Sequence, residues 1–355
     1  MKKALLAACA VLLLCSCSNN PVYTINANVK GIQGEAYLYN DRDDIADSCA
    51  VTDGAFTFTG KVGNPDFHTI AIKNEGRTVW ATRIIIEEGT ITVEGDTSDR
   101  FFPAKVSGTP ENEAFSTYEK ESGKFIEAYY SKDATGTQRD SVEKAYTAYS
   151  DSLSKANCGK NLLGLYLLSN DSYEMDPQAL LDSLETYPAE IQKNRTATKL
   201  KEEGEKKLAV SVGKKFKEID LNDTTGTAVS LSSVIAGNKY TLIDFWASWC
   251  HPCMGEVPTL AADYAAYGGK GFGIYGISLD KDTAAWKNCL VRNNMTWTNV
   301  SDVKGWDCAA AKDYAVNSIP SNFLVNVEGK IIATNLRGED LTNKLEELFT
   351  QAPEK

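Results

Sequence analysis

The sequence predicts an all-β, sandwich-like domain at the N-terminus, a helical connecting segment, and a layered α/β domain at the C-terminus. Three observations predict this organisation. The 355 residues are enough for two domains. Residues 22–108 contain short runs in which apolar and polar side chains alternate. Residues 211–355 instead alternate buried-strand and helical runs, and residues 109–210 between them have a helical period.

The region 22–108 consists of strand-like runs separated by turn signals. The runs are TINANV, AYLYN, AFTFTGKV, TVWATRIIIEEG and TITVEGD, and the turn signals include TDG, GNP and NEG. Many short antiparallel strands at this spacing predict a small sandwich or barrel. His68 lies in one of these strands without an evident partner, so we expect it to be structural.

Residues 109–210 form the predicted helical segment. Aromatic residues recur three and four apart in NEAFSTYEKESGKFIEAYY and DSVEKAYTAYSDSLSKAN. We interpret these tyrosine stripes as the apolar faces of packed helices and not as a ligand site. Further along, Asp176 followed by Pro177 is typical of a helix start.

Residues 211–355 alternate strands with helices. KYTLIDFWA is a buried-strand run that ends at a pair of cysteines, and GEVPTLAADYAAYG continues as a helix. GFGIYGISLD is a second buried strand, SNFLVNVEGKIIATN is a hairpin, and EDLTNKLEELFTQ is a final helix. This alternation around an apolar central strand predicts a layered α/β domain.

The first residues are expected to direct export. Lys2 and Lys3 precede an apolar run over residues 4–14, which has signal-peptide length and is too short to span a bilayer. The run ends in LCSC, which resembles a bacterial lipobox. The resemblance implies a signal peptide at 1–16, a lipid on Cys17 and a tether at 17–21. The alternative is an ordinary secreted protein that is cut nearby.

Export sets the expected location and redox environment. We expect a lipid-anchored membrane protein of the cell envelope that faces the periplasm, where disulfides persist. The formal net charge of −11 argues against nucleic acid as a partner. His68 and His251 are the only histidines in the sequence, which argues against His-based triads and His-rich metal sites. We therefore expect no metal.

The pair Cys250 and Cys253 in FWASWCHPC is the strongest functional signal. A zinc site would need a second such pair or spaced histidines. A structural staple would close too short a loop to stabilise much. The strand TLIDF brings Cys250 to the end of a sheet, and Pro252 starts a helix whose free N–H groups and dipole stabilise a thiolate. The pattern predicts a redox pair in which Cys250 is the nucleophile and Cys253 the resolving thiol.

The segment LIDFWASWCHPC resembles the active-site segment of thioredoxins. With GISLD, SIPSNFLVNVEGKIIA and LRGEDL, residues 211–355 resemble the exported TlpA/ResA-like branch of that superfamily. The resemblance implies a thioredoxin-like fold and a thiol-disulfide oxidoreductase that reduces or exchanges disulfides of extracytoplasmic proteins. It also implies a membrane electron donor, and no cofactor besides the Cys250–Cys253 disulfide. Residues 22–108 resemble an uncharacterised domain found ahead of such modules in lipoproteins.

The resemblance implies roles for two carboxyl groups. Asp244 lies six residues before Cys250, where thioredoxins keep a buried carboxylate. A carboxyl group in an apolar wall should have a raised pKa and is suited to accept a proton from Cys253. Glu256 matches an acidic position near the thiols in the TlpA/ResA-like branch, which implies a part in proton transfer. An ordinary strand-end aspartate and a surface glutamate in the first helical turn are the alternatives.

The resemblance also implies a substrate-binding surface. Ile319–Pro320 matches the cis-proline loop that faces the disulfide in this fold and offers backbone groups to an extended chain. Trp246 and Trp249 are expected to wall the site. His251 stands where ordinary thioredoxins have Gly, and its imidazole should favour the thiolate and make the pair more oxidising.

Two rival functions stay open at this point. A peroxidase of the peroxiredoxin type shares the fold, but its Pro-x-x-x-Thr-x-x-Cys motif would need Pro and Thr where this chain has Ile243 and Ala247. A binding or scaffold lipoprotein would work through its N-terminal domain and use the thioredoxin-like module as a redox accessory. Cys289 and Cys308 lie on predicted helices, and their spacing does not decide whether they are free or paired.

Overall fold

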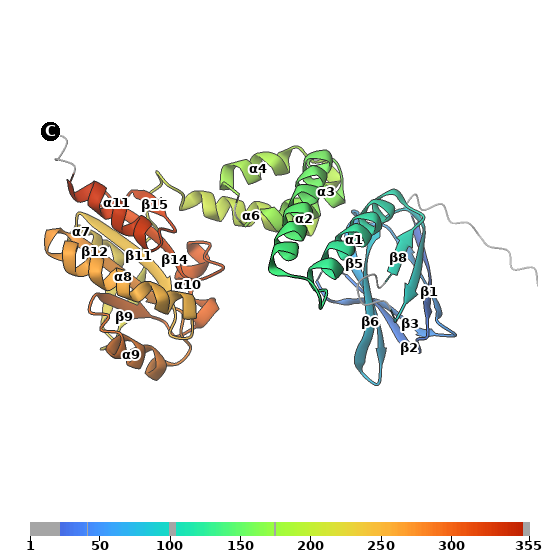
Figure 1. Ribbon diagram of the computed structural model, residues 1–355, viewed down its shortest axis with the longest axis horizontal. Coiled ribbons are helices and arrows are strands. Elements are labelled where there is room, and N and C mark those ends of the chain that lie inside the picture. Colours follow the sequence, from blue (N-terminus) through green and yellow to red (C-terminus); the bar gives the residue numbers. More distant parts are fainter. Residues whose placement is uncertain (1–21, 41, 99–103, 174, 351–355) are drawn as a thin grey trace, which may run out of the picture. The chain divides into compact units, whose positions relative to one another are not determined.

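The computed structural model describes residues 22–40, 42–98, 104–173 and 175–350, which divide into two compact units (Figure 1). The N-terminal unit runs to residue 174 and includes Ser183–Thr198, and the C-terminal unit consists of Met175–Asp182 and Lys199–Lys355. The helical segment is thus shared between the two units. The expected signal peptide and tether, with Cys17, lie outside the described residues.

Two four-stranded sheets form the N-terminal unit, and their inner side chains share one hydrophobic core. The strand orders are β4-β1-β7-β8 and β3-β2-β5-β6. In β1, Ile25, Ala27 and Val29 are buried and the polar residues between them are exposed, because successive side chains of a strand point to opposite faces. The predicted sandwich-like fold is confirmed. The strands are β1 (Val22–Lys30), β2 (Gly34–Tyr39), β3 (Ile45–Val51), β4 (Ala55–Lys61), β5 (Asp66–Asn74), β6 (Arg77–Ile86), β7 (Gly89–Asp96) and β8 (Ala104–Ser107).

Two features of this unit differ from the prediction. β1 and β7 pair in parallel, with Ile25 opposite Ile91, so the expectation of antiparallel strands is wrong for this central pair. The chain completes the second sheet before β7 returns to the first, and it arrives in the direction of β1. β3 and β8 were not predicted, since β3 is largely exposed without apolar alternation and β8 has only four residues.

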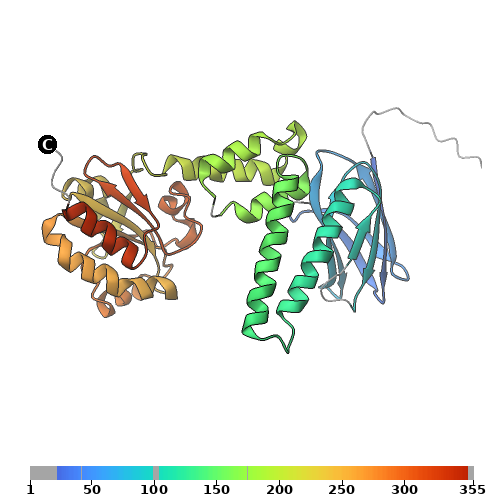
Figure 2. The same cartoon turned by 45° about the horizontal axis from the view of Figure 1, so that its top comes forward.

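Helices pack on this sandwich and on one another. They are α1 (Pro110–Tyr129), α2 (Gly136–Asn157), α3 (Leu162–Asp171) and α5 (Ala189–Gln192). α1 and α2 lie side by side as a hairpin (Figure 2). The buried Asn112 ties α1 to β6, because its Nδ2 donates to the Ile85 carbonyl at 2.7 Å and its Oδ1 accepts from the Ile85 N–H at 2.9 Å. The rings of Phe115, Tyr118 and Tyr166 pack at centroid distances of 5.2–6.1 Å, as interpreted from the stripes.

Two further helices precede the last domain, α4 (Pro177–Glu185) and α6 (Arg195–Ala209). The predicted start of α4 is confirmed, since Asp176 Oδ1 accepts the N–H groups of Gln178 and Ala179 at 3.0 Å each. These bonds satisfy two donors that have no partner inside the helix.

A seven-stranded mixed sheet of order β10-β9-β13-β12-β11-β14-β15 forms the centre of the C-terminal unit. β11 pairs in parallel with β12, and β12 with β13, whereas β14 runs antiparallel to β11. β12 is buried along its whole length, as expected for a strand covered on both faces. The strands are β9 (Asp220–Asp223), β10 (Ala228–Ser230), β11 (Tyr240–Trp246), β12 (Phe272–Ser278), β13 (Thr298–Ser301), β14 (Ser321–Asn326) and β15 (Ile331–Thr334).

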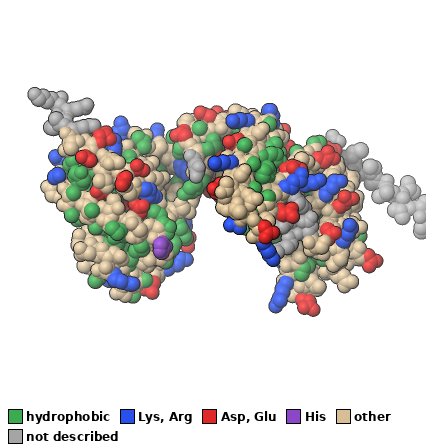
Figure 3. Space-filling view, in the orientation of Figure 1, with side chains coloured by type: hydrophobic (Ala, Val, Ile, Leu, Met, Phe, Trp, Pro, Cys, Tyr) green, Lys and Arg blue, Asp and Glu red, His purple; other side chains and the backbone are tan. Residues whose placement is uncertain are grey.

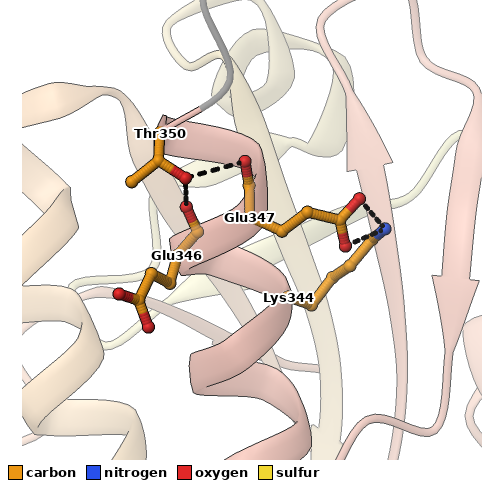
Figure 4. A network of polar contacts seen from close by, with 4 residues as sticks. All are labelled: Lys344, Glu346, Glu347 and Thr350. Carbon is orange, nitrogen blue, oxygen red and sulfur yellow. Dashed lines mark hydrogen bonds and ion pairs between the residues drawn. The ribbon is translucent and has the colours of Figure 1, made fainter.

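Helices cover this sheet, and α8 and α11 lie together on one face (Figure 2). Leu341 and Leu345 of α11 are buried in the core. The last turns of α11 carry an exposed pair of Lys344 with Glu347 at 2.9 Å, and Thr350 donates to backbone carbonyls one turn earlier (Figure 4). The helices are α7 (Leu231–Ala236), α8 (His251–Tyr267), α9 (Thr283–Arg292), α10 (Ala309–Asp313) and α11 (Glu339–Thr350), with short 3₁₀ turns at Gly268–Lys270 and Gly305–Asp307.

Acidic and basic side chains are interspersed over the visible face of each unit (Figure 3). Within the described residues, no helix is both long and apolar enough to cross a membrane.

Candidate active site

The loop between β11 and α8 carries the two cysteines. β11 ends at Trp246, and the Cys250 N–H donates to the Ala247 carbonyl at 3.1 Å, which turns the chain. The fully buried carboxylate of Asp280 holds this turn, since it accepts the Ser248 N–H at 3.0 Å and the Ser248 hydroxyl at 2.6 Å. α8 then begins at His251 with a proline in its first turn and Cys250 as its N-cap. A proline fits there because its missing N–H would have no partner inside the helix.

Cys250 and Cys253 form a disulfide with a Cα–Cα distance of 5.3 Å. The backbone N–H of Cys253 points at Cys250 Sγ over 3.2 Å, so the sulfur receives one of the free donors of the helix N-terminus. Burial does not distinguish the two residues, which are 5% and 3% exposed. The groups next to each sulfur do distinguish the two cysteines. Cys250 Sγ lies 3.6 Å from the Ile319 carbonyl, whereas Cys253 lines a small internal cavity.

The loop before β14 faces the disulfide. The Ile319–Pro320 peptide bond is cis, and the structure brings it next to Cys250. Trp249 is 56% exposed, and its ring lies 6.4 Å from that of Trp306, which is 42% exposed. Two large aromatic side chains are thus open to solvent beside the disulfide. Trp246 instead is buried and lines the internal cavity.

Asp244 lies behind the disulfide, in the same cavity as Cys253. Its side chain is in the middle of β11 among apolar residues, and the residue is 4% exposed. Burial raises the pKa of Asp244 to about 7, the Arg337 cation opposes the rise, and the Glu256 charge adds to it. The cavity volume that the centre of a water molecule can occupy is about 10 Å³. This is about the volume needed to hold one water.

Glu256 lies one turn of α8 beyond Cys253 and is half-buried in the same cavity. Its Oε2 accepts the backbone N–H of Gly338 at 2.9 Å, so it is not a free surface glutamate. Arg337 also lines the cavity, and its guanidinium donates to the Pro320 carbonyl. The structure therefore brings Asp244 and Glu256, expected from the sequence, together with an arginine that was not expected.

The remaining thiols of this unit do not pair. Cys289 and Cys308 are both free and buried, and burial raises the pKa of each thiol. Cys289 Sγ lies 3.4 Å from Met254 Sδ on α8, which is a packing contact. Within the described ranges, no group of three or more His, Cys, Asp or Glu side chains could hold a metal.

Sequence reasoning missed three residues of this site. Asp280 ends the buried run GFGIYGISLD, where a polar residue after an apolar strand is a signal for a site at the sheet edge. Trp306 and Arg337 carried no such signal, although Arg337 lies in the LRGEDL segment that contributed to the resemblance. They are 53 and 84 residues after Cys253 in the sequence, and only the fold brings them to the disulfide.

Two family models match the chain. A domain of unknown function, DUF4369, matches residues 23–115, and the AhpC/TSA family matches residues 212–334. The thiol-disulfide oxidoreductase ResA of Bacillus thuringiensis subsp. konkukian is 28% identical over 142 residues, which are 40% of this chain and 79% of that protein. ResA of Bacillus subtilis is 29% identical over 126 residues, which are 36% of this chain and 68% of that protein.

Solved structures of similar proteins cover the same part of the chain. A thiol-disulfide oxidoreductase from Bacteroides fragilis is 37% identical, with a TM-score of 0.36, and the match covers 38% of this chain and 99% of that one. The thioredoxin domain of a thiol-disulfide oxidoreductase from Bacteroides vulgatus is 35% identical, with a TM-score of 0.37, and the match covers 39% of this chain and 99% of that one.

The AhpC/TSA match and the ResA relatives fall on the unit that has the seven-stranded sheet, and they agree with its fold. The C-terminal unit is therefore a ResA/TlpA-like thiol-disulfide oxidoreductase with an AhpC/TSA-type, thioredoxin-like domain, and a DUF4369 domain precedes it in the chain.

Proposed function

We propose that this oxidoreductase is exported, is anchored to the membrane through Cys17, and reduces or exchanges disulfides of extracytoplasmic proteins through Cys250 and Cys253. The observation that carries the proposal is the disulfide at the start of α8, with the Ile319 carbonyl on one side and the cavity of Asp244 on the other. The lipobox-like LCSC supports the anchor.

The first step of the reduction is attack by Cys250. In the reduced enzyme, the N–H group of Cys253 and the positive end of α8 stabilise the Cys250 thiolate. This thiolate attacks one sulfur of a substrate disulfide. A Cys250–substrate S–S bond forms, the substrate S–S bond breaks, and the departing substrate thiolate takes up a proton from water.

The second step is resolution by Cys253. Its thiol gives a proton to Asp244, directly or through one water, because burial keeps the pKa of Asp244 near neutral. The Cys253 thiolate attacks Cys250 Sγ, the mixed disulfide breaks, and the second substrate sulfur leaves as a thiolate that takes up a proton from water. The substrate gains two electrons and the enzyme returns to the disulfide. A dithiol donor in the membrane is proposed to reduce the enzyme again.

The exposed ring pair Trp249 and Trp306 is proposed to bind the substrate chain beside its cysteine. An extended segment could pair with the backbone at Ile319, as in strand addition, while an apolar side chain packs on the rings. This arrangement favours unfolded or flexible protein segments over small disulfides.

Peroxide reduction is the second candidate, since the matching family model carries the AhpC/TSA name. The site does not favour it, because Ala247 stands where the peroxidase motif has Thr, and its fully buried methyl group offers no hydroxyl to a peroxide near Cys250. The two activities are separated by assaying the full chain with insulin disulfides and dithiothreitol, and separately with hydrogen peroxide. We expect rapid insulin reduction that is lost in Cys250→Ser, and peroxide consumption near the uncatalysed rate. The reverse pattern would contradict the proposal.

A further inference from the structure

The segment between β15 and α11 is fixed on both sides of Arg337. The buried Asn322 of β14 accepts the Leu336 N–H at 3.0 Å and donates to the Leu336 carbonyl at 2.8 Å. The next residue, Gly338, donates its N–H to Glu256 on α8 at 2.9 Å. Three hydrogen bonds to two other elements therefore set where the backbone of Arg337 lies.

The side chain of Arg337 reaches the substrate-facing loop. Its guanidinium donates to the Pro320 carbonyl and, at 3.4 Å, to the Leu336 carbonyl. Pro320 follows Ile319, whose carbonyl lies 3.6 Å from Cys250 Sγ. Arg337 thus holds the peptide directly after the one that contacts the nucleophile.

The same guanidinium lies in the cavity behind Cys253. The described titratable or charged residues that line this cavity are Asp244 from β11, Cys253 and Glu256 from α8, and Arg337 itself. Arg337 is the cation of the set, which also contains two carboxyl groups. Its charge opposes the effect of burial on Asp244, so the acceptor stays able to ionise near neutral pH.

We propose that Arg337 is a positioning residue that joins the Ile319–Pro320 substrate loop to the carboxyl pair Asp244 and Glu256 behind Cys253. The inference rests on the proposed function and adds a residue to it. A planar guanidinium suits this position because it can donate to a carbonyl and keep its charge towards carboxylates. A lysine would keep the charge but not the fork of donors.

The inference predicts two separable effects. Arg337→Gln removes the charge and weakens the bond to the loop. We expect its KM for insulin to rise about tenfold, since a hydrogen bond from a charged group is lost. We also expect the pH midpoint of the resolving step to rise by about one unit, because Asp244 loses its cation. Arg337→Lys should raise KM as well but leave the pH midpoint within about 0.3 units of the parent.

The experiment uses the full chain, with insulin and dithiothreitol at varied pH, and follows the resolving step by single-turnover quenching. Arg292→Gln is the matched control, because Arg292 is an exposed arginine at the end of α9, outside the cavity. Circular dichroism reports whether each variant is folded. If Arg337→Gln does not fold, Arg337→Lys decides: a raised KM with an unchanged midpoint supports the inference, and a KM like that of the parent overturns it.

Two results would overturn the inference. One is a folded Arg337→Gln with the KM and the pH midpoint of the parent. The other is a lower kcat that follows only the folded fraction, which indicates a purely structural arginine. An inactive parent would instead refute the proposed function, so the two failures are distinguishable.

Discussion

Replacing Asp244 with Asn should stabilise the C-terminal unit at alkaline pH. The carboxyl group is 4% exposed, and burial raises its pKa from 3.8 to about 7, a shift of about three units. At about 1.4 kcal/mol per unit, the shift corresponds to about 4 kcal/mol. Because the folded pKa is raised, the folded state binds the proton more tightly than the unfolded state. The stabilisation of the folded state by this bound proton is complete below about pH 4 and is lost as the pH rises through about 7.

The free energy of unfolding of the parent should therefore fall by about 4 kcal/mol between pH 4 and pH 8, apart from contributions of other groups. Asn cannot ionise, so Asp244→Asn should lack this fall. The two proteins should be similar near pH 4, and the variant should be more stable at pH 8. Urea unfolding of the oxidised full chain, followed by tryptophan fluorescence, measures this. Five of the six tryptophans belong to the C-terminal unit, because Trp80 alone lies outside it.

The same substitution should slow catalysis. With no acceptor for the Cys253 proton, resolution of a mixed disulfide should fall roughly 100-fold near neutral pH, and its pH dependence around 7 should disappear. A variant that is more stable and less active would fit the assignment. Stability curves of parent and variant that run parallel from pH 4 to 8 would refute the burial argument. Equal resolution rates across that range would refute the proton-acceptor role.

Three other predictions follow from the site and the sequence. Cys253→Ser should accumulate covalent complexes with protein substrates on non-reducing gels, and Cys250→Ser should trap nothing; trapping by Cys250→Ser alone would reverse the two roles. Trp306→Ala should raise KM for insulin about tenfold with little change in kcat, because it removes a ring from the proposed binding surface, while Trp306→Phe should stay near the parent. Cys17→Ala should move the protein from the membrane to the soluble exported fraction, and unchanged fractionation would count against the lipid anchor.

The fold class could be predicted because it depends on local patterns. Short alternating runs predicted the β-rich domain, and the apolar strand before Cys250 predicted the layered α/β unit, whose β11 is buried along nearly its whole length. The parallel pairing of β1 with β7 could not be predicted in this way. Pairing direction depends on the path the chain takes between two sheets, and alternation is the same in parallel and antiparallel strands.

The candidate site shows the same division. Spacing and the known physics of helix ends predicted the Cys250–Cys253 pair and the proline in the first turn of α8. The resemblance to thioredoxins added the carboxyl group six residues before Cys250. Trp306, Arg337 and the Asp280 carboxylate under the turn reach the disulfide only because β12, β14 and the segments after them lie beside β11. The sequence by itself predicted which two cysteines form the disulfide at the start of α8. The tertiary structure alone decided that Asp280, Trp306 and Arg337 join them, because burial and long-range contact have no signature in local spacing.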